Sequence, residues 1–261
     1  MLTRMPVAAE RSPRRGNSTA DRAIDILLLF DDKRLSLSVE EITEGLKTHR
    51  STTYRYLQSL LSYALLEEDL SGGYRLGSRV LQLARLCRRG TGLTEVALPV
   101  MRELAQETGE TVLLTRLFGN QVICVERVDR SDQPVRIVYE RGQVLPLTSH
   151  MGASARILLA HLSSDAQRLL LQGVPGLPLA ATLRELAQIR QAGYVVAGPD
   201  AETYVRGIAA PVFGAEPGVA VAGLGLAGPS FRVPDELLNT YVELVTRAAA
   251  SMSADLAAID A

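Results

Sequence analysis

The sequence predicts an α+β fold in two parts: an N-terminal winged helix-turn-helix domain and a C-terminal domain in which helices pack on an antiparallel sheet. Three observations support this prediction. Residues 35–77 hold a capped helix, a short turn, a second helix and two short strands. An amphipathic stretch at residues 79–91 predicts a linker helix. The remaining residues, 92–261, mix strands and helices without strict β-α-β alternation.

The bulk composition excludes several classes of protein. The chain has 261 residues, 47% of them hydrophobic and 22% charged, which allows two ordinary domains with real cores. No apolar run approaches the ~20 residues that span a bilayer. The N-terminus lacks an apolar signal segment, so we expect a cytoplasmic protein. Cys87 and Cys124 show no metal or redox spacing and lie in apolar stretches, so we expect two buried thiols.

The charges are distributed unevenly along the chain. Residues 1–90 contain 15 Lys and Arg against 11 Asp and Glu, whereas the rest contains 13 against 18. A basic front on an acidic body is typical of a DNA-binding head joined to a regulatory body. Residues 1–18 hold four arginines and no hydrophobic period, so we expect a disordered tail. That tail is either a solvated leader or a basic arm that contacts DNA.

The head, residues 19–78, begins with three predicted helices. Ile24, Leu27 and Leu28 follow the helical period over residues 20–31 and predict one buried face. Ser38 and Glu41 form a capping box that starts the second helix. Residues 48–51 then make the turn, the third helix spans residues 51–62, and residues 65–77 form the wing hairpin.

The third helix is the candidate recognition helix. We expect Tyr54, Leu57, Leu60 and Leu61 to face inward, which leaves hydroxyls, an aromatic ring and an arginine on the opposite face. Such groups can meet phosphates and base edges. Winged helices also bind proteins, so a protein-interaction or sensor module without a DNA role remains an alternative. The candidate DNA-binding residues are His49, Arg50, Ser51, Thr52, Thr53, Arg55, Tyr56, Ser59 and Arg75.

The linker helix carries an apolar stripe formed by Val80, Leu83, Ala84 and Cys87. Something must cover this stripe, and a second copy of the chain is a candidate.

The body is predicted from its periodicity and turn signals. We expect helices at 93–107, 152–162, 164–171, 181–191 and 235–258, and strands at 111–117, 122–128, 135–139, 194–196, 208–213 and 219–226. Ser164 and Gln167 predict the cap of the helix at 164–171. Leu145-Pro146-Leu147 enters a turn before the helix at 152–162. The N–H groups at such a helix start can bind an anion, or the segment is ordinary core packing.

Enzyme and metal functions find little support. Gly152-Ala153-Ser154-Ala155-Arg156 nearly matches the G-x-S-x-G nucleophile elbow of an esterase-like enzyme, but Arg156 replaces the second glycine. His161, the only later histidine, lies in the same predicted helix and cannot act as the base that such a serine needs. We therefore expect no enzyme. The histidines and cysteines have no metal-ligand spacing, so we expect no metal and no cofactor.

A family resemblance extends these predictions. Thr48–Leu66 followed by Gly73–Gly77 resembles the DNA-binding domain of the IclR family of bacterial transcription regulators. The resemblance continues in Leu145–Ser149 with Ala155–Ala160, in Gly207–Val212, and in Gly228-Pro229 with Arg232. It covers roughly residues 20–250. It implies a GAF-like effector-binding domain, a small-molecule effector, and a repressor that binds a palindromic operator in double-stranded DNA as a dimer or a dimer of dimers.

The resemblance also implies the effector site. The family usually has Gly near Tyr204 and commonly Ser or Cys near Gly207, Gly225 or Ala227, so we expect a roomier, more apolar pocket for an aromatic or longer-chain acid. The family often has Gly-Lys where Ser154-Ala155-Arg156 stands. The implied effector-binding residues are Leu145, Leu147, Met151, Gly152, Ala153, Ser154, Glu202, Tyr204, Gly207, Gly225 and Ala227.

Overall fold

The computed structural model describes residues 19–31, 33–89, 92–129, 139–148, 151–198, 204–216 and 218–260. The chain divides into two compact units, one within Arg11–Thr91 and one comprising Gly92–Ala261. The tail predicted at residues 1–18 lies outside the described residues. Within the described ranges, no helix is both long and apolar enough to cross a bilayer.

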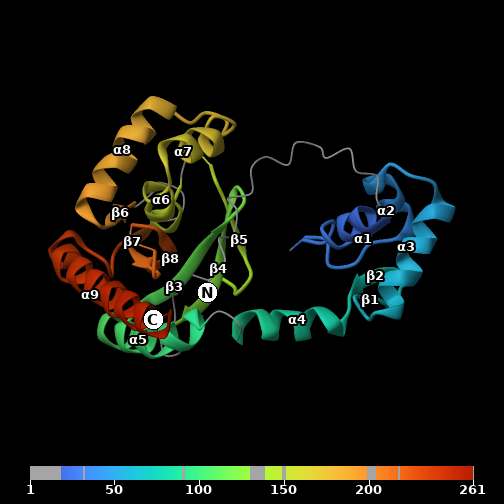
Figure 1. The fold of residues 1–261 in the computed structure, drawn as a ribbon, viewed down its shortest axis with the longest axis horizontal. Helices are drawn as coiled ribbons and strands as arrows, with labels where there is room; N and C mark the ends of the chain where they lie inside the picture. Colours follow the sequence, from blue (N-terminus) through green and yellow to red (C-terminus); the bar gives the residue numbers. More distant parts are fainter. Residues whose placement is uncertain are drawn as a thin grey trace. The chain divides into compact units, whose positions relative to one another are not determined.

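The N-terminal unit is a winged helix-turn-helix (Figure 1), as the sequence predicts. β1 and β2 pair antiparallel and form the wing after the third helix. The elements of this unit are α1 (Thr19–Leu27), α2 (Val39–Leu46), α3 (Arg50–Ser62), β1 (Leu66–Glu68), β2 (Tyr74–Leu76) and α4 (Ser78–Arg89).

The predicted capping box at the start of α2 is confirmed. The Ser38 hydroxyl accepts from the Glu41 amide at 3.2 Å, and the Glu41 carboxylate accepts from the Ser38 amide at 2.7 Å. At its other end α2 stops at Lys47, which adopts a left-handed conformation (φ 51°) and donates its N–H to Glu44 O. This tight ending leaves only residues 47–49 between α2 and α3.

Three inward-facing positions were predicted wrongly. Ile24 on α1 and Leu28 just after the helix are 51% and 56% exposed, whereas Ile26 is fully buried. Ile26 lies about 200° around the helix from Ile24, so the buried face of α1 centres on Ile26, and only Leu27 of the three predicted residues packs against the core. On α3, Leu57 and Leu60 are buried as predicted, but Tyr54 is 39% exposed.

The α4 helix leaves its apolar side chains exposed. Leu81, Leu83 and Leu86 are more than half exposed, and Cys87 is exposed as well. The prediction of a buried thiol is therefore wrong for Cys87 and confirmed for Cys124. The reason is that the periodic stripe on α4 does not face the core of its own unit.

The C-terminal unit is built on one six-stranded sheet in which every neighbouring pair is antiparallel. The order across the sheet is β5-β4-β3-β8-β7-β6. β8, the last strand in the sequence, therefore lies beside β3, the first strand of this sheet. The strands are β3 (Thr111–Phe118), β4 (Gln121–Val128), β5 (Val144–Pro146), β6 (Val195–Ala197), β7 (Val205–Phe213) and β8 (Ala220–Pro229).

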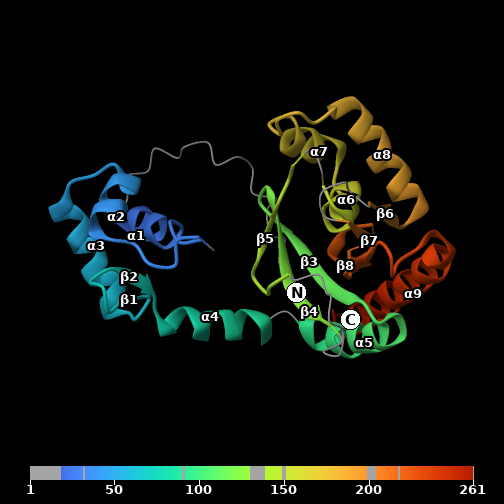
Figure 2. The same cartoon turned by 180° about the vertical axis from the view of Figure 1, so that it is seen from behind.

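Helices cover both faces of this sheet (Figures 1 and 2). α5 and α9 pack on one face, where Ile208, Leu224 and Val245 belong to one buried core. α6 and α8 pack together on the other face, where Ile157, Leu186 and Ala209 belong to a second core. The helices are α5 (Leu93–Thr108), α6 (Ala153–Ala160), α7 (Ser164–Leu171), α8 (Leu179–Ala192) and α9 (Asp235–Asp260).

Two details of the body differ from the prediction, and a third is largely outside the described residues. The turn expected at Leu145 is a short edge strand, β5, because its residues pair with Gln121–Ile123 of β4. The cap of α7 is Ser163, whose hydroxyl accepts from the Ala166 amide, and not Ser164. Most of the strand predicted at 135–139 lies outside the described residues, and Tyr139 itself is not in a strand.

Candidate functional site

The first candidate site is the outer face of α3. Arg50, Ser51, Arg55 and Ser59 are exposed there, and His49 is exposed at the helix start. Thr52 and Tyr56 are half-buried, and Tyr56 packs against the core of the unit. α3 contains no acidic residue, so this face combines hydroxyls, amides of the first helical turn and cationic side chains.

Thr53 does not belong to this face. Its side chain is fully buried, and its hydroxyl lies 3.1 Å from that of Thr43 and 3.3 Å from the carbonyl of His49. The bond to Thr43 connects α3 to α2, and the bond to His49 lies within the first turn of α3. The prediction that Thr53 contacts DNA is therefore wrong, because the residue lies one helical turn before Leu57 on the inner face.

The cations near this face differ in their partners. Arg50 forms an ion pair with Glu40 at 2.9 Å and lies over the Tyr54 ring at 5.8 Å. Arg75 on the wing is 3.4 Å from Glu67. The guanidinium of Arg55 has no ion pair or hydrogen bond with any residue that the structure describes. Arg55 is therefore available to a phosphate or a guanine edge without losing a partner.

Two of the three acidic residues of the wing accept hydrogen bonds from groups in the wing or beside it. Asp69 accepts hydrogen bonds from the Ser36 hydroxyl, from Ser71 and from the amide of Gly73, and these bonds lower the pKa of Asp69. Glu67 accepts from the Ser78 amide at 2.9 Å. Glu68 alone of the three points outward as an exposed carboxylate.

The second candidate site is the start of α6 in the C-terminal unit. Met151 is buried, and Leu145 and Leu147 are half-buried against the same core. Gly152 begins the helix in an extended conformation and offers no side-chain cap. The first N–H groups of α6 therefore have no side-chain acceptor, which suits an anionic ligand.

Arg156 braces this helix start. Its Nε donates to the carbonyl of Met151 at 2.8 Å, and its guanidinium pairs with Glu185 of α8. The guanidinium thus connects the loop before α6 to the helix that packs beside it. Both its Nε and its Nη1 therefore already have partners within the protein.

Gly207 and Gly225 serve the approach of α6 to the sheet. A Cβ at Gly207 would lie 3.3 Å from the Cβ of Ala153, and one at Gly225 would lie 3.3 Å from the hydroxyl of Ser154. The space that a larger residue would take is therefore filled by α6 itself. Gly207 and Gly225 therefore do not create the roomier pocket that we expected, because α6 packs close to the sheet at both positions and fills the space.

Ala227 has a different neighbourhood. It is buried with Leu113 and Cys124, and Tyr139 and Val205 pack against these three residues. We call Leu113, Cys124 and Ala227 the floor cluster. Burial raises the pKa of Cys124 to about 11, so its thiol is neutral and the floor cluster is uncharged.

Of the two remaining implied effector residues, the structure describes only Tyr204. Glu202 is outside the described residues. Tyr204 has an exposed side chain and a positive φ of 52°, the conformation for which glycine is suited. The structure brings Leu145, Leu147 and residues 151–154 together with Gly207 and Gly225, and Tyr204 is not in that group.

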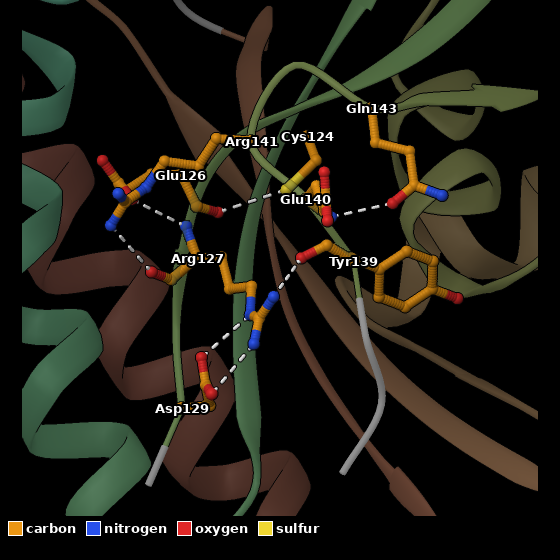
Figure 3. Close-up of polar contacts among 8 residues, drawn as sticks. All are labelled: Cys124, Glu126, Arg127, Asp129, Tyr139, Glu140, Arg141 and Gln143. Atoms are coloured by element: carbon orange, nitrogen blue, oxygen red, sulfur yellow. Dashed lines mark hydrogen bonds and ion pairs between the residues drawn. The ribbon is translucent and has the colours of Figure 1, made fainter. Parts of the chain in front are cut away.

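A polar network beside the floor cluster was missed in the sequence (Figure 3). Arg127 on β4 binds Asp129 and the carbonyl of Tyr139, and Glu126 pairs with Arg141. The partners are separated by up to fifteen residues. No short sequence motif predicts the contacts to Tyr139 and Arg141, because each joins β4 to a residue more than ten positions further along the chain.

The esterase and metal interpretations find no support in the geometry. The imidazole of His161 has its Nδ1 2.9 Å from the carbonyl of Ile157, and the Ser154 hydroxyl lies beside Gly225. In the described ranges, no three His, Cys, Asp or Glu residues gather as metal ligands would.

Comparison with known proteins identifies the family. Residues 88–254 match the family profile described as "Bacterial transcriptional regulator IclR C-terminal", and residues 19–70 match "IclR helix-turn-helix domain". The chain belongs to the IclR family. It is therefore a DNA-binding transcription regulator and not an enzyme.

Individual relatives of this IclR-family regulator support the same assignment. The transcriptional regulator BhcR of Paracoccus denitrificans is 31% identical over 93% of this chain and 88% of its own length. The regulator KipR of Bacillus subtilis is 30% identical over 91% of this chain and 96% of its own. The crystal structure of an IclR homologue from Microbacterium hydrocarbonoxydans, complexed with 4-hydroxybenzoate, superimposes with a TM-score of 0.77 at 28% identity, over 92% of this chain and 100% of that one.

Proposed function

We propose that this regulator is a cytoplasmic repressor that binds a palindromic operator as a dimer or a dimer of dimers, and that a small organic acid controls this binding. In this proposal, two copies of α3 enter successive major grooves. The exposed Arg55, which has no partner among the described residues, carries the proposal. Because the target is chromosomal DNA, the proposal places the protein in the cytoplasm.

The contacts to DNA would be divided between phosphates and bases. Ser51, Thr52 and the first amides of α3 suit phosphates, and Arg55 and Ser59, one helical turn apart, suit base edges. Arg50 and Arg75 contribute through their charge, although each would first have to leave a carboxylate partner. His49 lies at the helix start, where a phosphate would bind.

The effector would bind between the start of α6 and the floor cluster. The first N–H groups of α6 would hold the carboxylate, and Met151 with the floor cluster would contact the apolar part. An apolar, uncharged floor favours an aromatic or longer-chain acid. The homologue that binds 4-hydroxybenzoate supports this class of ligand.

A gel shift with the DNA upstream of the regulator's own gene and its neighbours tests the DNA contact. We expect Arg55→Ala to abolish the specific complex, since a lost bidentate contact costs about 1–3 kcal/mol in each half-site. Arg75→Ala is the matched control, because Arg75 is already paired with Glu67, and we expect a smaller loss. Equal binding by Arg55→Ala and the unmodified chain would contradict the proposed interface.

A proline scan of helix starts tests the effector site. Ala153→Pro removes one N–H of α6 at the first helical position, where proline is tolerated. We expect its affinity for benzoate or 4-hydroxybenzoate to fall about tenfold or more, as for a lost hydrogen bond to a charged group. Ser164→Pro, at the first position of α7, is the control and should bind as the unmodified chain does. Equal affinity for Ala153→Pro would contradict this anion site.

A further inference from the structure

The side chain of Arg127 is held by groups on either side of residues 130–138 in the sequence. Its Nε and Nη2 donate to the two oxygens of Asp129 at 2.8 and 2.9 Å, and its Nη1 donates to the carbonyl of Tyr139 at 2.6 Å (Figure 3). Arg127 and Asp129 are both only 17% exposed. A planar guanidinium is required for this arrangement, since it offers three donors in fixed directions.

These bonds attach Tyr139 to the strand that carries the floor cluster. Arg127 and Cys124 both lie on β4, and Arg127 faces Leu113 of β3 across the ladder. Tyr139 packs against the floor cluster from outside the sheet. The position of its ring therefore depends on a carbonyl that Arg127 holds.

The floor cluster adjoins the start of α6. Ala227 is the cross-strand partner of Gly207, and Gly207 lies directly beneath Ala153. Cross-strand partners have Cα atoms about 5 Å apart. An acid whose carboxylate meets the first amides of α6 would therefore place its apolar part on the floor cluster, next to Tyr139.

We propose that Arg127 is a positioning residue for effector selectivity: by holding the carbonyl of Tyr139, it keeps the Tyr139 ring against the floor cluster and so limits the size of the acid that fits. The inference rests on the proposed effector site. Arg127 acts through Tyr139 and not as the counter-ion of the effector, because Asp129 already neutralises its charge.

A pair of conservative variants separates this role from a general loss of stability. Arg127→Lys keeps the positive charge beside Asp129 but cannot reach the carboxylate and the Tyr139 carbonyl together. Arg141→Lys is the matched control, because the Arg141 side chain pairs with the Glu126 carboxylate and donates to the backbone carbonyl of Arg127, whose guanidinium it leaves in place. Arg127→Gln provides a second, stronger substitution at the same position.

The first measurement needs no effector. In a Cys87→Ser background, the reaction of Cys124 with a thiol reagent reports how well the floor cluster is covered. We expect Arg127→Lys and Arg127→Gln to react about tenfold faster than the parent chain, and Arg141→Lys to react at the parent rate. Equal rates in Arg127→Lys, Arg127→Gln and the parent would overturn the positioning role.

The second measurement compares acids of different size. We expect the ratio of affinities for 4-hydroxybenzoate and pyruvate to change about tenfold in Arg127→Lys and to stay constant in Arg141→Lys. Weaker binding of both acids by the same factor would overturn the selectivity role, since it reports only a loosened fold. If the parent chain binds neither these acids nor hexanoate, the effector class of the proposed function fails, while the thiol reaction still decides whether Arg127 positions Tyr139.

Discussion

Arg232 forms a two-pronged ion pair with Glu110, with Nε 2.5 Å from Oε1 and Nη2 2.8 Å from Oε2. Glu110 is almost fully buried, so this guanidinium is its main compensation. The pair connects the start of β3 to the loop after β8, two segments more than a hundred residues apart. Gly228 lies against the same carboxylate.

Gly228→Ala should strongly destabilise the C-terminal unit. A Cβ at Gly228 would lie 2.5 Å from Oε2 of Glu110, and the carboxylate cannot retreat without leaving Arg232. We expect a loss of about 2 kcal/mol or more in the free energy of unfolding, measured by urea titration. Gly173→Ala, where a Cβ would meet no atom within 4 Å, is the control and should change little. Comparable stability of the two variants would refute this role of Gly228.

Tyr204 offers a stabilising substitution. Its φ of 52° is costly for any residue with a side chain, and the side chain itself is 68% exposed. Tyr204→Gly and Tyr204→Ala both remove the ring, but only glycine adopts the positive φ without the steric strain that a Cβ causes. We expect Tyr204→Gly to be more stable than Tyr204→Ala by about 1 kcal/mol in chemical denaturation. The reverse order would show that this backbone conformation carries no strain.

These positions show how far the sequence could predict the structure. The cap at Ser38 and the positions of most strands along the chain, such as the pair at 111–117 and 122–128, depend on neighbouring residues, and they were predicted correctly. The outward face of α1 was not, because Ile24, Ile26 and Leu28 are all apolar and only tertiary packing selects which of them is buried. Gly207 and Gly225 were expected to enlarge the pocket from the family resemblance, and nothing in the sequence shows how closely α6 approaches the sheet at these two residues.

His161 makes the stability of the C-terminal unit depend on pH. Burial lowers the pKa of His161 below the usual 6.5, and its ring packs edge-on against Phe213 at 5.3 Å. Between the lowered folded value and 6.5 the unfolded chain binds more protons, so stability falls as the pH falls below about 6.5. We expect His161→Gln to lose less stability than the unmodified chain between pH 7.5 and 5.5 in urea titrations. Parallel losses in both would argue that other groups cause the pH dependence.

Leu83 tests the proposed association of two copies. It is 51% exposed on α4, and a charge there would oppose burial against a second apolar stripe. We expect Leu83→Glu to shift the chain towards the monomer in light scattering, whereas Arg85→Glu on the same helix should leave the oligomeric state unchanged. A monomeric unmodified chain, or an unaltered Leu83→Glu oligomer, would contradict association through α4.

The central claim is that the exposed face of α3 binds duplex DNA through unpaired positive charge. The most direct measurement is a titration of the full chain with a generic duplex at several salt concentrations. We expect binding at low salt, with the logarithm of the association constant falling linearly as the logarithm of salt rises, and a slope smaller by about one in Arg55→Ala. A chain that ignores the duplex at low ionic strength, or binds it with no dependence on salt, would contradict the account.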